Sequence, residues 1–243
     1  MKRRTARRHR RMDRHGHATL RMAVGMMMIT CCIAPSGAAA QADSPRLLRS
    51  GTAFFVTHTG NMLTSAHVVR GCKAIVVWPR SEAGLPASLI LIDDRLDVAL
   101  LATRHAVDAI AVPAVRPVAA GAPVYTIGFG LTPSSPRVPV YTRGYAEGVA
   151  YVNGHRLLVL HAELREGNSG GPVIDASGRL AGMIVGRYTD APGSSVAVRA
   201  EDLASLAGMV PDRGARPAQP RGGGNWRSRL ERIAALVQCI DDS

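Results

Sequence analysis

The feature that most constrains the fold is a succession of short apolar runs interrupted by turn residues. From about residue 49 onwards, stretches rich in Val and Ile alternate with Gly, Pro, Asn and Asp; examples are "GTAFFVTH", "MLTSAHVV", "KAIVVW", "PVYTIGF" and "LAGMIVG". Two turns between such runs, Asn153-Gly154 and "DASGR" at 175–179, are typical of β-hairpins. The pattern favours an all-β sandwich or barrel over alternating βα units.

The β pattern stops near residue 199. "AEDLASLAGM" predicts a short helix with acids in its first turn. Residues 211–225, "PDRGARPAQPRGGGN", have the composition of a linker. In residues 226–243, apolar side chains recur at helical spacing and predict an amphipathic helix; they are Trp226, Leu230, Ile233, Val237 and Ile240. This helix either packs back on the barrel or mediates self-association.

A glycine-rich stretch around Ser169, "REGNSGGPVI", is a candidate nucleophile site. A serine hydroxyl is a weak nucleophile until a base takes its proton, so the stretch alone is equally compatible with a turn leading into a strand. Gly167 has no side chain, and its N–H and that of Ser169 could converge on one oxygen.

Candidates for a base and for its orienting acid lie earlier in the chain. His67 follows the small residues Ser65 and Ala66, which leave room for an imidazole that faces an open cleft. Asp97 stands directly before the apolar run "VALL", so its carboxylate can be drawn inward. Each residue also has a simpler interpretation, as a surface histidine and as a turn aspartate.

Taken together and in this order, the stretches "GTAFFVTHTGNMLTSAHVV", "DVALL" and "GNSGGPVID" resemble the trypsin-like serine proteases. The resemblance is closest to the bacterial HtrA/Deg-type branch without a PDZ domain, and it covers residues 51–208. It implies the chymotrypsin-like fold, with two six-stranded antiparallel β-barrels and a catalytic cleft between them. We therefore expect a protease domain at 43–210; the 33 residues from Pro211 onwards are too few for a PDZ domain.

The resemblance also implies a role for each candidate. His67 is the general base and then the general acid, Asp97 orients it, and Ser169 is the nucleophile. Gly167 and Ser169 are the oxyanion-hole donors, with Asn168 between them. Because Asn168 carries no charge, we expect no activation by pairing with a new N-terminal ammonium.

The resemblance defines the substrate pocket less directly than it defines the catalytic residues. Glu163, six residues before the serine, and the segment Val185, Gly186 and Arg187 are its candidate lining. An acid at the pocket floor predicts a preference for Arg or Lys in the substrate. Arg187 predicts the opposite preference, or a blocked pocket, and Glu163 is also compatible with a solvent-facing position.

The net charge of +12 is concentrated at the front of the chain. Residues 1–42 hold nine of the 30 basic residues and one of the 18 acids, which leaves a difference of +4 for the rest. A basic stretch, the apolar run "MAVGMMMITCCIA" and the small residues before Ala42 predict a signal peptide cleaved after Ala42. A basic disordered arm is the alternative. We expect a periplasmic or extracellular protein without a membrane span after cleavage, because the apolar run is too short.

Two cysteines, Cys72 and Cys239, remain after such a cleavage. They are compatible with one disulfide or with two free thiols. The chain has no CxxC or HExxH motif and no His/Cys cluster, so we expect neither a metal site nor a cofactor.

Three functions fit these features to different degrees. The first is an exported serine endopeptidase that acts on protein or peptide substrates through an acyl-enzyme. The second is a latent or inactive protease-fold protein that serves as a binding or scaffold module. The third, a nucleic-acid binder, is not expected, because the charge outside residues 1–42 is modest and aromatic residues make up 4% of the chain.

Overall fold

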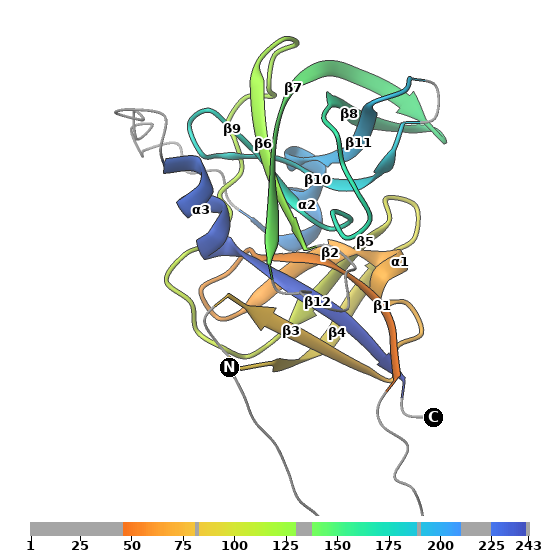
Figure 1. Cartoon of the computed structure of the whole chain (residues 1–243), viewed down its shortest axis with the longest axis vertical. Coiled ribbons are helices and arrows are strands. Elements are labelled where there is room, and N and C mark those ends of the chain that lie inside the picture. Colours follow the sequence, from red (N-terminus) through yellow and green to blue (C-terminus); the bar gives the residue numbers. More distant parts are fainter. Residues whose placement is uncertain (1–45, 81–82, 130–137, 189–190, 210–224, 242–243) are drawn as a thin grey trace, which may run out of the picture. The chain divides into compact units, whose positions relative to one another are not determined.

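The computed structural model describes residues 46–80, 83–129, 138–188, 191–209 and 225–241, whose strands form two closed antiparallel β-barrels (Figure 1). The predicted signal peptide and residues 211–224 of the predicted linker lie outside this part of the chain. The two six-stranded barrels confirm the predicted chymotrypsin-like fold class.

The first barrel joins its strands in the order β1-β12-β3-β4-β5-β2. The strands are β1 Arg46–Phe55, β2 Asn61–Ser65, β3 Ala74–Pro79, β4 Leu85–Asp93, β5 Val98–Ala102 and β12 Ala234–Asp241. The second barrel has the order β10-β11-β8-β7-β6-β9. Its strands are β6 Pro123–Phe129, β7 Pro139–Val152, β8 His155–His161, β9 Pro172–Asp175, β10 Leu180–Arg187 and β11 Ser194–Arg199.

Alternation along β1 divides its side chains between two cores. Phe55 packs in a cluster with Met62 and other residues of the first barrel. Phe54, its neighbour, belongs to a different cluster that includes Leu180 and Met183 of the second barrel. Successive side chains of a strand point to opposite faces, so one strand lines its own barrel and also packs against the other. The residues of the candidate site lie at this junction.

Both predicted hairpins are present. Asn153 and Gly154 connect β7 to β8 with φ of 50° and 81°, the left-handed conformations that a tight hairpin turn requires. The stretch 175–179 connects β9 to β10, with Gly178 at φ 78°. The predicted short helix is α2, Ala200–Ala207, with Glu201 and Asp202 in its first turn. None of the helices in the described ranges is long and apolar enough to cross a membrane.

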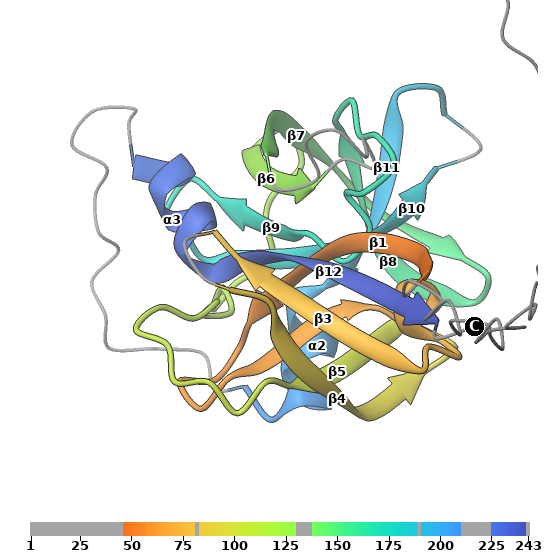
Figure 2. The same cartoon turned by 60° about the horizontal axis from the view of Figure 1, so that its bottom comes forward.

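The prediction of a helix throughout residues 226–243 is wrong from Ala234 onwards. Helix α3 ends at Ile233, and Ala234–Asp241 is strand β12, which lies between β1 and β3 and closes the first barrel (Figure 2). The run "IAALV" is buried on both sides, since Val237 packs inside the barrel and Leu236 packs with Ile127 and Phe129 of the second barrel. A continuous apolar run of this length fits the spacing of a buried helix and of a buried strand equally well, so the spacing alone does not distinguish them.

Helix α3, Asn225–Ile233, packs on β6 and β9 of the second barrel (Figure 1). The Trp226 ring stacks on Tyr125 with 4.7 Å between ring centroids. Glu231 accepts a hydrogen bond from Tyr141 of the second barrel and pairs with Arg80 at the end of β3. The pKa of Tyr141 is raised to about 12; burial is the largest cause and the hydrogen bond to Glu231 is the second. The C-terminal segment therefore joins the two barrels.

Cys72 and Cys239 form a disulfide with Cα atoms 5.4 Å apart, which decides between the two alternatives left open by the sequence. Cys72 follows helix α1, Ala66–Val69, and Cys239 lies in β12. The bond closes a loop with a sequence separation of 167 residues and ties β12 to the end of the helix that carries His67.

Candidate active site

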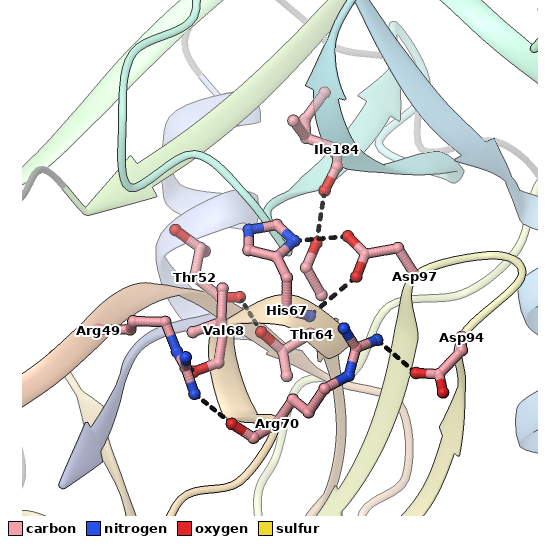
Figure 3. A network of polar contacts seen from close by, with 10 residues as sticks. Arg49, Thr52, Thr64, His67, Val68, Arg70, Asp94, Asp97 and Ile184 are labelled. Atoms are coloured by element: carbon pink, nitrogen blue, oxygen red, sulfur yellow. Dashed lines mark hydrogen bonds and ion pairs between the residues drawn. The ribbon is translucent and has the colours of Figure 1, made fainter.

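His67 and Asp97 form a side-chain pair at the edge of the first barrel (Figure 3). His67 lies in α1, directly after β2, and Asp97 ends the turn between β4 and β5. The Nδ1 of His67 lies 2.6 Å from Oδ2 of Asp97, and the backbone N–H of His67 donates to Oδ1 at 2.8 Å. An ionised carboxylate can only accept, so this geometry suits the tautomer of a neutral imidazole that carries its proton on Nδ1 and leaves a lone pair on Nε2.

The backbone of Asp97 is itself unusual. Its φ is 55°, a left-handed backbone conformation that residues other than glycine rarely adopt, although aspartate tolerates it better than most. Its carbonyl oxygen accepts a hydrogen bond from the N–H of Ala66 at 3.0 Å. Three contacts therefore hold the Asp97 residue against the segment that carries the imidazole.

Ser169 lies in a tight loop between β8 and β9. The N–H of Asn168 donates to the carbonyl of Arg165 at 3.1 Å, and the N–H of Gly171 donates to the carbonyl of Asn168 at 2.8 Å. The side-chain Oδ1 of Asn168 accepts the N–H of Arg165 at 3.0 Å, and Asn168 is buried. Asn168 therefore stabilises the loop, and its own N–H is already in use.

The N–H groups of Gly167 and Ser169 behave differently from their neighbours. Within the described part of the chain neither donates a hydrogen bond, whereas those of Asn168, Gly170 and Gly171 all do. Gly167 has φ 92°. Gly167 is buried and Ser169 is half-buried, and N–H groups away from water are nearly always paired, so the two unpaired groups on either side of Asn168 are a distinctive feature.

Gly170 lets the loop approach the first barrel. It has φ 81°, and a Cβ on it would lie 2.1 Å from the carbonyl oxygen of Thr52 and 2.5 Å from Oγ1 of Thr64. No side chain fits at these distances. The N–H of Gly170 donates to the carbonyl of Ile184 at 2.8 Å, and the hydroxyl of Ser65 donates to the same oxygen at 3.2 Å. The carbonyl oxygen of Ile184 thus links Ser65, two residues before His67, to Gly170, the residue after Ser169.

Thr52, in β1, is a residue that the sequence reasoning missed. It is fully buried and its N–H donates to the carbonyl of Ser169 at 2.8 Å. Its Oγ1 donates to the carbonyl of Gly167 at 2.7 Å and accepts the N–H of Phe129 at 3.1 Å. The available signal was a hydroxyl residue at the start of the apolar run "GTAFFV", where an all-apolar strand would need none.

Ser169 is half-buried, and within the described residues no hydrogen bond joins its hydroxyl to His67. Such contacts are often long in a site without substrate and tighten when substrate binds. The structure therefore shows an oriented imidazole, a loop serine attached to the same junction, and two unpaired N–H groups.

The predicted pocket residues separate into two places. Glu163 is exposed and lines a hollow of about 550 Å³ with Tyr145 and His161. Val185 and Arg187 line a different hollow, which also includes Asp97. Gly186, between them, is half-buried.

Comparison with known proteins gives the family. Residues 51–183 match the family of the trypsin-like peptidase domain. The chain is 32% identical over 139 residues to the uncharacterized protein y4bJ of Sinorhizobium fredii, with 57% of this chain and 22% of that protein covered. It is 28% identical over 166 residues to a probable periplasmic serine endoprotease, DegP-like, of Rhizobium meliloti, with 67% and 32% covered. The chain thus spans less than half the length of either curated relative.

Among solved structures, the Rv3671c protease of Mycobacterium tuberculosis in its inactive form is similar, with a TM-score of 0.58 and 26% identity. The similarity covers 70% of this chain and 87% of that one. These relatives confirm the predicted resemblance to HtrA/Deg-type proteases. The chain belongs to the trypsin-like peptidase family.

Proposed function

We propose that this protein is an exported serine endopeptidase that cleaves peptide bonds through an acyl-enzyme, with Ser169 as nucleophile, His67 as base and Asp97 as its orienting acid. The observation that carries the proposal is the pair of unpaired N–H groups at Gly167 and Ser169, on a loop that shares the Ile184 carbonyl acceptor with Ser65, close in the chain to the His67–Asp97 pair. Family membership supports a protease, and the geometry supports these residues.

In the proposed first step, the proton of the Ser169 hydroxyl passes to Nε2 of His67 as Oγ bonds to the substrate carbonyl carbon. The carbonyl oxygen becomes an oxyanion, and the N–H groups of Gly167 and Ser169 donate to it. Asp97 stabilises the imidazolium that forms, and the Nδ1 proton stays on the imidazole of His67. The carbon–nitrogen bond then breaks as His67 returns the proton to the leaving amine. Water hydrolyses the acyl ester with His67 again as base.

Fluorophosphonate labelling tests the nucleophile. The purified protein and its Ser169→Ala variant are incubated with the probe and read by intact mass. We expect one adduct on the parent and none on the variant, with peptide cleavage lost by about 10³-fold or more in the variant. A folded parent that takes no label would contradict the proposal and favour a latent binding module on the same fold.

Export is the second part of the proposal. The signal-like segment of residues 1–42 supports it, and so does the Cys72–Cys239 disulfide, because such bonds persist in oxidising compartments. Mass spectrometry of the protein recovered from a periplasmic or culture fraction should show an N-terminus at Asp43. Retention of residues 1–42 in a cytoplasmic fraction would count against export.

A further inference from the structure

A hollow of about 310 Å³ opens beside the His67–Asp97 pair, on the side of Asp97. We name it the Arg187 hollow. Three segments line it: Arg95 to Asp97 in the β4–β5 turn, the β7–β8 hairpin with Asn153 and His155, and the end of β10 with Arg187. Its apolar wall consists of Leu96, Val152, Leu157, Val185 and Val196. The hollow adjoins the candidate site through Asp97, which lines it and also bonds His67.

The polar lining of this hollow is mainly cationic. Arg95 and Arg187 are exposed, and His155, which also lines the hollow, is half-buried. Within the described residues, Asp97 is the one carboxylate that lines the hollow, and it is engaged by His67.

The neighbouring acids of the β4–β5 turn are committed elsewhere. Asp94 forms an ion pair with Arg70, on the other side of the turn (Figure 3). The Oδ1 of Asp93 accepts the backbone N–H groups of Arg95 and Leu96 at 2.9 and 3.1 Å. Arg95 and Arg187 make no ion pair with another described residue, and both are exposed where they line the hollow.

We infer that the Arg187 hollow binds an acidic side chain of the peptide substrate, within a few residues of the cleaved bond. This inference rests on the proposed function and names its substrate class. A guanidinium presents N–H donors in a planar fork that matches a carboxylate, and the apolar wall accommodates the methylene groups of Glu. Lys or Arg in the same position meets two like charges.

The selectivity is expected to be moderate, because both guanidinium groups are exposed to water. A Glu-containing peptide should be cleaved about three- to tenfold faster, in kcat/KM, than its Gln counterpart at one position near the cleaved bond. The ratio should shrink between low and high salt, because exposed charges are screened.

A positional peptide library tests this inference. Glu, Gln, Ala and Lys are placed in turn at four positions on either side of the bond, and kcat/KM is measured for the full protein. Arg187→Glu should abolish or invert the Glu-over-Gln preference. Arg156→Glu is the matched control: Arg156 is exposed on the same hairpin but does not line the hollow, and its substitution should leave the preference in place.

Two results would overturn the inference. One is a wild-type protein that cleaves Glu and Gln peptides equally at every position. The other is a preference that Arg187→Glu leaves intact or that Arg156→Glu reduces as much. Fluorophosphonate labelling of the same preparation separates the two proposals. A labelled, unselective enzyme ends the inference and leaves the proposed function standing, whereas an unlabelled and inactive one ends both.

Discussion

The two barrels hold their shares of the candidate site by different means. In the first barrel, His67 and Asp97 meet side chain to side chain at 2.6 Å, and a disulfide reinforces the end of the helix that carries His67. In the second barrel, the loop of Ser169 is held mainly through its own main-chain N–H and carbonyl groups, two of which bond the side chains of Asn168 and Thr52, and the barrel contains no cysteine. The first half should therefore be sensitive to side-chain chemistry, and the second to backbone geometry.

The largest effect on activity is expected in the first barrel, where side chains hold the candidate site. Asp97→Asn keeps the size of the side chain but removes its charge and allows the wrong tautomer of His67. We expect kcat/KM for peptide cleavage to fall by about 10³-fold or more, with little change in the midpoint of thermal unfolding. Asp94→Asn, at the ion pair with Arg70, is the control and should cost less than about twofold. A mild loss in Asp97→Asn would mean that the carboxylate does not orient the base.

The backbone half is tested by Gly170→Ala, because a Cβ there would lie 2.1 Å from the Thr52 carbonyl oxygen. We expect a loss of about 3 kcal/mol in the free energy of unfolding, measured by denaturant titration, together with loss of labelling. Gly121→Ala is the control that measures backbone strain alone, since Gly121 has φ 79° and nothing within 4 Å of its Cβ position. Equal losses in the two variants would show that close approach is unimportant.

The disulfide should matter for stability more than for chemistry. Replacing Cys72 and Cys239 together by Ser is expected to lower the free energy of unfolding by about 2 to 4 kcal/mol, because the closed loop is long. Denaturant unfolding with and without reductant measures this. Reductant should destabilise the parent and leave the double variant unchanged; an unaffected parent would show that the bond contributes nothing.

The smallest effect is expected at Thr52, where the two halves meet. Thr52→Val keeps the shape and the backbone N–H but removes the hydroxyl that bonds Gly167 and Phe129. We expect kcat to fall by about tenfold with KM nearly constant, because the Gly167 peptide loses its anchor. Thr52→Ser restores the hydroxyl and should restore kcat. If Ser fails to rescue, the residue acts through packing alone.

Local patterns were sufficient for much of the molecule. Short Val- and Ile-rich runs predict strands because a strand buries alternate side chains over a few residues, and Asn153-Gly154 predicts a hairpin because its turn needs positive φ. The stretches around His67, Asp97 and Ser169 were each ambiguous alone and became candidates only together, because their order resembles the trypsin-like serine proteases.

Features that depend on partners far along the chain could not be read in this way. Residues 234–241 are apolar at helical and at extended spacing, and they form a strand because the first barrel has an open position between β1 and β3. Thr52 acquires its importance from Gly167 and Ser169, more than 100 residues away.

The same limit applies to the pocket. Glu163 follows β8 and Arg187 ends β10, and they line different hollows because β11 lies between these two strands in the second barrel. Most strands and turns were thus decided by neighbours within a few positions, and the candidate catalytic residues by the order of three motifs. Barrel closure, the anchor of the Ser169 loop and the charge that lines the Arg187 hollow were decided by long-range packing, which the order of residues does not display.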